Sequence, residues 1–126
     1  MSIIGLGIDI IENIRITKIY NKFSHRLPKR ILSKIEFDQY QNCKHPVKFL
    51  TKCFVIKEAA VKALGTGINN GITFNQFEIT NNEVGKPLLK LFNKAHNIAQ
   101  LLGVRYIHIT LTHERLYTCS VVILEN

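Results

Sequence analysis

Apolar and small residues alternate along the first ten positions of the chain. Isoleucine or leucine stands at positions 4, 6, 8 and 10, and Gly5, Gly7 and Asp9 stand between them. A period of two is typical of a β-strand, so we expect a strand over residues 3–10 with one apolar face. On the other face Asp9 follows two glycines, which have no side chains, so a bulky group has space to approach the backbone beside its carboxylate.

Helical spacing follows this strand. Apolar residues recur every three or four positions over residues 12–23, which predicts a helix there. Ser33 and Glu36 form a capping box that predicts a short helix through Tyr40, and Pro28 offers an earlier start for it.

A longer, central helix is expected over residues 47–64. Strong helix formers fill this segment, and Gly65 provides a stop. Its buried stripe is expected to consist of Cys53, Ile56, Ala60, Ala63 and Leu64.

The second half of the chain mixes strands with one helix. Strands are predicted over 74–80, 88–92, 106–112 and 117–124, and a helix over 93–102 that stops at Gly103. The order βαααββαββ predicts an α+β fold with a mostly antiparallel sheet packed against the central helix, rather than a doubly wound parallel sheet. No repeat or linker divides the chain, so we expect one domain over residues 1–126.

The composition agrees with one globular domain. The 126 residues are 46% hydrophobic and 21% charged, close to the average for such domains. No apolar run could span a bilayer and no signal-peptide pattern is present, so we expect a cytoplasmic protein with no membrane partner. The three cysteines form no C-x-x-C pair and are expected to be reduced thiols: Cys43, Cys53 and Cys119.

The formal charge of +8 favours an acidic partner. Nucleic acid, a phosphorylated metabolite, an anionic membrane and an acidic protein all fit this charge. AT-rich coding sequence, which tends to yield isoleucine, asparagine and lysine, accounts for the lysines equally well. The charge alone therefore does not choose a partner.

Two carboxylates have surroundings that suggest chemistry. Asp9 follows the glycine face, although an aspartate near a strand end also commonly caps the next helix. Glu58 lies one turn before Lys62, a spacing that most often gives a surface ion pair. Two carboxylates from different elements, away from any Cys or His cluster, suit Mg²⁺ rather than zinc.

The end of the central helix offers a second feature. The turn Gly65-Thr66-Gly67 exposes backbone N–H groups that can hold a phosphate, and Lys62 adds a positive charge one turn earlier. The spacing of a Walker A loop is absent. His113 follows a predicted strand in a hairpin loop, where a functional role and a plain surface position both stay open.

The chain contains the segments IGLGIDIIE, KEAAVKALGTGI, FNQFEI, GKP and LTHERLYTCSVVILE, in this order and over essentially its whole length. Together they resemble the holo-[acyl-carrier-protein] synthase family. The resemblance implies a domain of the 4'-phosphopantetheinyl transferase type that transfers 4'-phosphopantetheine from coenzyme A to a serine of apo acyl carrier protein, releasing 3',5'-ADP, in support of fatty acid biosynthesis. The short length implies a homotrimer with active sites at subunit interfaces.

The resemblance also implies roles for individual residues. Asp9 and Glu58 become magnesium ligands, and Lys62 contacts the phosphates of coenzyme A. Further cofactor contacts are implied for Gly65, Thr66, Gly67, Lys86, Pro87 and His113. In the implied mechanism the carrier serine attacks the β-phosphate, Mg²⁺ and Lys62 neutralise charge, and Glu58, directly or through a metal-bound water, accepts the serine proton.

The first helix of the family docks the acidic carrier protein. The residues implied for this docking are Arg15, Lys18, Lys22 and Arg26. One departure is Cys53, which stands where much of the family has arginine before F-x-x-K-E-A; the adjacent Lys52 could supply the cation.

Two rival functions remain at this stage. A small basic nucleic-acid-binding domain agrees with the charge, but no recognition-helix, zinc-finger or aromatic RNA-binding signature is present. A magnesium-dependent nuclease or phosphohydrolase shares the carboxylates, but needs no surface for a carrier protein.

Overall fold

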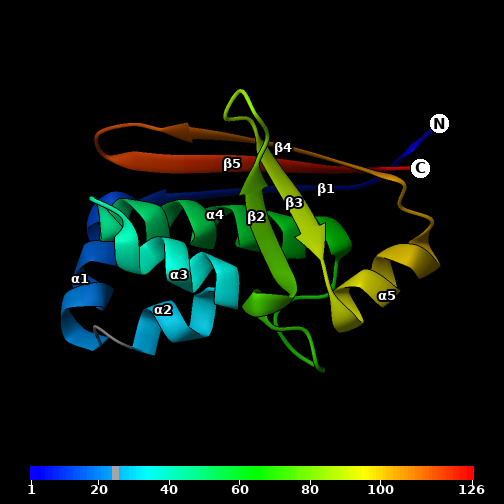
Figure 1. Ribbon diagram of the computed structural model, residues 1–126. Coiled ribbons are helices and arrows are strands. Elements are labelled where there is room, and N and C mark those ends of the chain that lie inside the picture. Colours follow the sequence, from blue (N-terminus) through cyan, green and yellow to red (C-terminus); the bar gives the residue numbers. More distant parts are fainter. Residues whose placement is uncertain (24–25) are drawn as a thin grey trace.

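A three-stranded antiparallel sheet forms one layer of the fold (Figure 1). Its strands are β1 (Ile3–Glu12), β5 (Tyr117–Glu125) and β4 (Tyr106–His113), with β5 in the middle. The computed structural model describes residues 1–23 and 26–126. The two termini lie side by side, and the Asn126 N–H donates to the Ser2 carbonyl at 2.9 Å.

The central helix α4 (Pro46–Leu64) lies against the inner face of this sheet. Proline in its first turn favours the helix start, and Gly65 ends the helix with a φ of 77°, which glycine adopts without strain. All five residues of the expected stripe are buried. The prediction of a central helix is confirmed.

The other elements pack around α4. In Figure 1, helices lie near both ends of α4 and a small β-sheet lies in front of it. These elements are α1 (Asn13–Phe23), α2 (Arg26–Ile31), α3 (Lys34–Asn42), β2 (Phe77–Asn81), β3 (Pro87–Leu91) and α5 (Asn93–Leu102). β2 and β3 pair antiparallel, and β3 lies beside β4. The α+β prediction is therefore confirmed.

Two segments differ from the sequence prediction. Residues 26–31 form a helix of their own, because Ser33 has extended backbone (φ −70°, ψ 171°) and caps α3 as the predicted capping box. Residues 74–76 form a 3-10 turn instead of the start of a strand. Gln76 is buried there and its Oε1 accepts the N–H of Ala95 at 3.0 Å, which binds this segment to α5 rather than to a neighbouring strand.

Gly5 and Gly7 allow α4 to approach β1 very closely. A Cβ at Gly7 would lie 1.8 Å from the carbonyl oxygen of Ala59, and one at Gly5 would lie 2.0 Å from that of Ala63. Real Cβ atoms do not come this near to another atom, so only glycine is compatible with this packing. The predicted cleared face exists, and the bulky group that lies on it is the backbone of α4.

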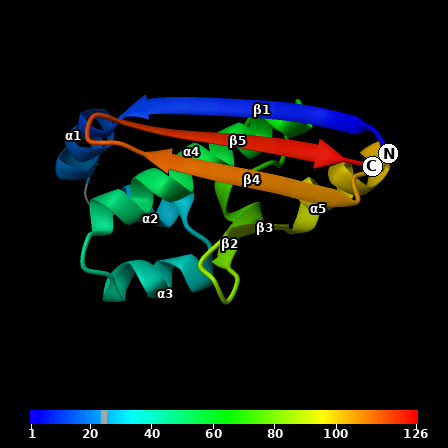
Figure 2. The same ribbon diagram turned by 90° about the horizontal axis from the view of Figure 1, so that it is seen from above.

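The opposite face of β1 is apolar and exposed. Leu6, Ile8 and Ile10 are 57–64% exposed, and the strand register sets Val121 and Ile123 of β5 beside them on this face. Figure 2 looks onto the face, which no part of the described chain covers. A contiguous apolar patch of this kind is typical of a protein interface.

A buried ion pair connects α4 to the rest of the fold. Lys57 Nζ lies 2.5 Å from Glu36 Oε1, and neither side chain is exposed to solvent. Lys57 also donates to the Ile31 carbonyl at 2.6 Å, and Glu36 Oε2 accepts the N–H of Ile79 at 2.6 Å. Because both charges have several partners, the pair fixes α4 relative to α3 and β2.

Cys53 belongs to the core. All three cysteines are free thiols, as expected. Burial raises the pKa of the Cys53 thiol to about 12, so it stays protonated and unreactive at neutral pH. Cys53 therefore packs in the core, and its neighbour Lys52 keeps a partly exposed position.

Over residues 1–23 and 26–126, no helix has both the length and the apolar character needed to cross a membrane.

Replacing Lys57 with methionine should destabilise the fold by about 3–5 kcal/mol, because the Glu36 charge would be left buried without its partner. The double variant Lys57→Met/Glu36→Gln should lose less than Lys57→Met alone. Lys48→Met changes an exposed lysine of the same helix and should alter stability by less than about 0.5 kcal/mol. Denaturant unfolding measures all three, and a Lys57→Met variant as stable as the unmodified chain would contradict the pairing.

Gly7→Ala should destabilise the fold by at least about 1–3 kcal/mol, because the new Cβ meets a backbone oxygen that cannot rotate away. Amide NMR signals along β1 and α4 should shift as the helix moves. Gly103→Ala is the control for the position of the NMR shifts: its φ of 84° strains alanine, but its Cβ meets only Asn126 Nδ2, at an ordinary 3.6 Å. Shifts in that control should be confined to the end of α5; unchanged α4 signals in Gly7→Ala would contradict the close approach.

Candidate active site

Lys62 reaches from α4 to Asp9 on β1. Its Nζ lies 2.9 Å from Asp9 Oδ1 and donates to the Ile8 carbonyl at 3.1 Å. Among the described residues, Lys62 pairs with Asp9 rather than with Glu58, and Asp9 accepts no hydrogen bond from the backbone of α1. The capping alternative for Asp9 is therefore wrong. The side chain of Asp9 is only 15% exposed, so this ion pair is partly shielded from solvent.

Glu58 and Asp9 line one hollow of about 250 Å³ between β1, α1 and α4. Burial raises the pKa of the Glu58 carboxyl, the charge of Asp9 raises this pKa further, and Lys62 lowers it. Arg15 also lines the hollow, and its walls are the apolar side chains of Ile10, Ile11, Ile16, Ile19, Leu27 and Phe54. We call this the carboxylate hollow.

The carboxylate hollow offers a metal ion two ligands. Asp9 and Glu58 both supply hard oxygen atoms, and Mg²⁺ typically takes one or two carboxylates and completes its shell with water and substrate phosphate. Across residues 1–23 and 26–126, no group of three or more His, Cys, Asp or Glu side chains is arranged to hold a metal. The donor set fits Mg²⁺ together with a phosphorylated ligand, and it does not fit a closed zinc site.

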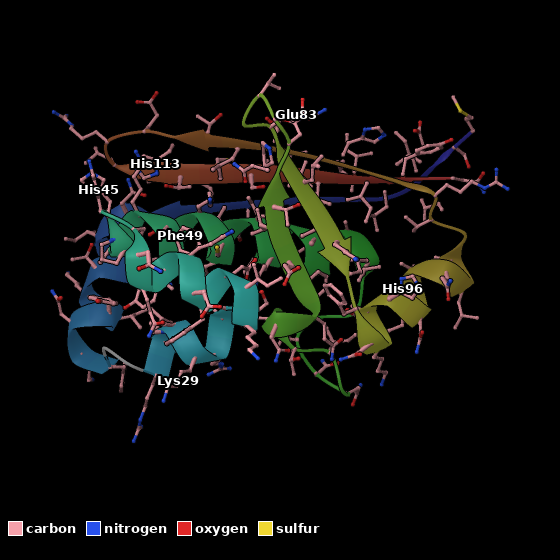
Figure 3. The ribbon with its side chains drawn as sticks, in the orientation of Figure 1. Lys29, His45, Phe49, Glu83, His96 and His113 are labelled. Atoms are coloured by element: carbon pink, nitrogen blue, oxygen red, sulfur yellow. The ribbon has the colours of Figure 1, made fainter. Side chains whose placement is uncertain are left out.

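A second hollow, of about 280 Å³, lies between β4 and the segment that leads into the first turns of α4. We call it the basic hollow, because four of its residues are lysine or histidine from one short segment. Its lining residues are Cys43, Lys44, His45, Lys48, Phe49, Lys52, Leu111 and His113. Figure 3 shows His45 and His113 close to each other at this end of the molecule.

The basic hollow was not anticipated as a group. Lys48 and Lys52 lie one turn apart on α4, and Lys44 precedes the helix; their spacing of four is visible in the sequence. The sequence interpretation considered only His113 and Lys52. The sequence does not show which strand these lysines face.

Lys86 and Pro87 line a neighbouring hollow. It lies between the β2–β3 turn and β4, and Lys52 contributes to it as well as to the basic hollow. The structure thus brings Lys86, Pro87 and His113 near one another through Lys52. These three residues therefore lie along the β4 edge of the sheet.

The two groups of candidate residues lie at opposite edges of the sheet. The carboxylate hollow is beside β1, and the hollows with His113 and Lys86 are beside β4, with β5 between the two strands. Gly65, Thr66 and Gly67, all within the described chain, line none of these three hollows. A single chain therefore does not gather all the predicted site residues in one cleft.

A cationic surface lies next to the carboxylate hollow. Arg15, Lys18 and Lys22 are exposed along α1, and Arg26 is exposed at the start of α2. Beside them is a fourth hollow, lined by Ile19, Phe23, Arg26, Leu27 and Arg30. Because Arg15 also lines the carboxylate hollow, this surface is continuous with it. The sequence interpretation missed Phe23 and Arg30, whose positions depend on how α2 packs on α1.

Comparisons with known proteins identify the family of the chain. Residues 5–122 match the family model of the 4'-phosphopantetheinyl transferase superfamily. The chain is 54% identical to the holo-[acyl-carrier-protein] synthase of Photorhabdus laumondii, over 99% of both chains. It is 51% identical to that of Pectobacterium atrosepticum, over 100% of both chains.

Solved structures are similar over the whole fold. The crystal structure of the Neisseria meningitidis holo-[acyl-carrier-protein] synthase has a TM-score of 0.93 at 29% identity, covering 99% of this chain and 100% of that chain. The Bacillus anthracis synthase in complex with CoA (3',5'-ADP) has a TM-score of 0.80 at 32% identity, covering 98% and 97%. This chain therefore belongs to the holo-[acyl-carrier-protein] synthases of the 4'-phosphopantetheinyl transferase superfamily.

Proposed function

We propose that this chain transfers 4'-phosphopantetheine from coenzyme A to a serine of apo acyl carrier protein, releasing 3',5'-ADP, at the carboxylate hollow. The observation that carries the proposal is that Asp9 and Glu58 line one hollow with Lys62 bound to Asp9 at 2.9 Å. This combination suits charge neutralisation at a phosphate that is being transferred. The product supports fatty acid biosynthesis, and the comparisons give no support to the nucleic-acid alternative.

Mg²⁺ is the proposed metal, held by Asp9 and Glu58. When bound, it would draw charge from the pyrophosphate oxygens of coenzyme A. Lys62 keeps Asp9 in position. Its side chain is 52% exposed, and its ammonium group donates two hydrogen bonds within the chain, so the third N–H can contact a phosphate oxygen. The chain itself therefore contributes two ligands and one positive charge to the reacting group.

Glu58 is the proposed acceptor of the serine proton. Burial and the nearby Asp9 raise the pKa of its carboxyl, which makes the carboxylate a better base than an exposed glutamate. The apolar walls of the hollow limit access of water, so a hydroxyl of the carrier competes more effectively as the nucleophile.

The basic hollow is the proposed position for a further phosphate of coenzyme A. Three lysines supply positive charge there, and the Lys86-Pro87 turn adjoins it through Lys52. Gly65, Thr66 and Gly67 remain proposed contacts to the cofactor from another side. Because these proposed contacts do not share one hollow in a single chain, one coenzyme A molecule would contact residues of more than one chain.

A homotrimer is the proposed assembly. The β1 edge of each chain carries the carboxylates and the β4 edge carries the basic hollow, so a head-to-tail contact between chains would join the two into one site. The exposed strip of Leu6, Ile8 and Ile10 supplies apolar area for such a contact. Head-to-tail contacts that close give a ring, in which every chain contributes to two sites.

The cationic surface on α1 and α2 is the proposed docking surface for the carrier protein. Arg15, Lys18, Lys22 and Arg26 would attract an acidic helix, and Phe23, which is 44% exposed, offers an apolar contact among them. Arg15 borders both this surface and the carboxylate hollow, so a serine on the docked partner would enter the site beside it.

Intact-mass spectrometry of apo acyl carrier protein tests the proposed function. Incubation with this chain, coenzyme A and Mg²⁺ should add the mass of phosphopantetheine to the carrier, and a chelator should prevent it. Asp9→Asn should slow transfer by at least about a hundredfold, because a metal ligand is lost. Asp38→Asn changes an exposed aspartate of α3 and should leave transfer unchanged.

Two results would contradict the proposal. No mass gain on the carrier with the unmodified chain would exclude transfer, and hydrolysis of coenzyme A in its place would favour the phosphohydrolase alternative. Near-normal transfer by Asp9→Asn would show that the carboxylate hollow is not the site.

A further inference from the structure

His113 is tied to the start of α1 through a buried hydroxyl. Thr118 lies opposite His113 in the β4–β5 register, and its Oγ1 is 2.8 Å from His113 Nδ1 and 2.6 Å from Asn13 Oδ1. Asn13 in turn holds the hairpin, because its Nδ2 lies 2.8 and 3.1 Å from the carbonyl oxygens of Glu114 and Arg115. The five groups form one continuous network of hydrogen bonds.

Counting donors fixes the direction of each bond. The Glu114 and Arg115 carbonyls can only accept, so the Asn13 amide turns Nδ2 toward them and Oδ1 toward Thr118. Asn13 Oδ1 also can only accept, so Thr118 donates its single hydroxyl hydrogen to it. Thr118 Oγ1 then has only lone pairs for His113. The hydrogen between them therefore belongs to His113 Nδ1.

The other neutral tautomer, with the hydrogen on Nε2, would leave two oxygen atoms in contact with no hydrogen between them. If His113 Nδ1 carried no hydrogen, it would require the hydrogen of Thr118, and Thr118 Oγ1 would face Asn13 Oδ1 at 2.6 Å with no hydrogen between the two oxygens. Thr118 is 0% exposed, so water cannot relieve this contact. Only the Nδ1–H form of the ring satisfies all members of the network.

The second ring nitrogen is the one left for a ligand. His113 lines the basic hollow, and no side chain or backbone group in the described chain bonds to its Nε2. In the neutral Nδ1–H form, Nε2 can only accept a hydrogen bond. A phosphate monoester well above its second pKa of about 6 also can only accept. The two can bond only after Nε2 gains a proton.

We propose that Asn13 and Thr118 are positioning residues that hold neutral His113 as its Nδ1–H tautomer, so that phosphate binding in the basic hollow protonates Nε2. The proton comes from solvent, forms the Nε2–H bond with the ring lone pair, and returns to solvent when the ligand leaves. No other covalent bond changes. This rests on the proposed function, in which the hollow receives a phosphate of coenzyme A.

Several other ionisable groups surround the ring. Those that line the hollow with it are Cys43, Lys44, His45, Lys48 and Lys52. Those of the hairpin and of the adjoining end of β1 are Glu114, Arg115, Tyr117 and Glu12. Proton uptake must therefore be assigned to His113 by substitution rather than by pH dependence alone.

The tautomer can be observed directly in the ligand-free chain. Long-range ¹H–¹⁵N NMR of the full chain, at a pH where His113 is neutral, should show Nδ1 as the protonated nitrogen. Loss of the signals in His113→Gln assigns them. Thr118→Ser keeps the hydroxyl and should keep the Nδ1–H form, whereas Thr118→Val should let the Nε2–H form appear. Thr112→Val, on the exposed face of β4, is the matched control and should leave the His113 signals unchanged.

Calorimetry measures how many protons the chain takes up when the ligand binds. Titration with 3',5'-ADP in two buffers of different ionisation enthalpy should give an uptake of up to about one proton per chain above that of His113→Gln. Thr118→Val should take up less, because its neutral ring can already donate from Nε2.

The outcomes separate this inference from the proposed function. An Nε2–H tautomer in the unmodified chain overturns the inference even if the carrier protein is modified normally. Equal proton uptake by the unmodified chain and His113→Gln also overturns it. If Thr118→Val does not fold, these two measurements on the unmodified chain and His113→Gln still decide. An Nδ1–H ring in a chain that modifies no carrier protein would support the hydrogen-bond network and contradict the function.

Discussion

The contact between two glycines of β1 and the backbone of α4 sets the geometry on which the site depends. Carbonyl oxygens of α4 occupy the positions where the Cβ atoms of Gly5 and Gly7 would otherwise lie. This brings Lys62 within 2.9 Å of Asp9, two residues after Gly7 on the same strand face, and lets Glu58 share a hollow with Asp9. The buried Lys57–Glu36 pair holds the opposite side of the same helix, so α4 is fixed on both sides.

The position of α4 against the sheet also keeps the carboxylates apart from the cationic residues. The helix and the sheet put carboxylates beside β1, and lysines and His113 beside β4. An enzyme that must hold both the reacting pyrophosphate and another phosphate of one long cofactor needs both groups. The proposed trimer resolves this, because a neighbouring chain can bring its β4 edge to the β1 edge of the first. The exposed apolar strip on β1 is consistent with such a contact.

The sequence predicts the elements better than it predicts how the site is assembled. Alternation in β1, the capping box at Ser33 and the glycine stops are local signals, and each corresponds to an element of the structure. The 3-10 turn before β2 and the pairing of Lys62 with Asp9 depend on contacts between distant segments, which a periodic pattern does not contain. The glycine face of β1 predicted space for a bulky group but not that the group is the backbone of α4, because a pattern shows that side chains are missing and not what takes their place. The lysine row before Lys52 could be seen in the sequence, but not the strand that it faces.

The central claim is that one active site combines the β1 edge of one chain with the β4 edge of another. Mixing two inactive variants tests it: Asp9→Asn, which lacks a carboxylate, and Lys52→Ala/Lys86→Ala, which lacks the cations beside β4. After co-refolding in equal amounts, about a quarter of the head-to-tail contacts should combine two intact edges, so the mixture should transfer phosphopantetheine although neither variant does alone. A mixture no more active than the separate variants would show that each site lies within one chain and would contradict the account.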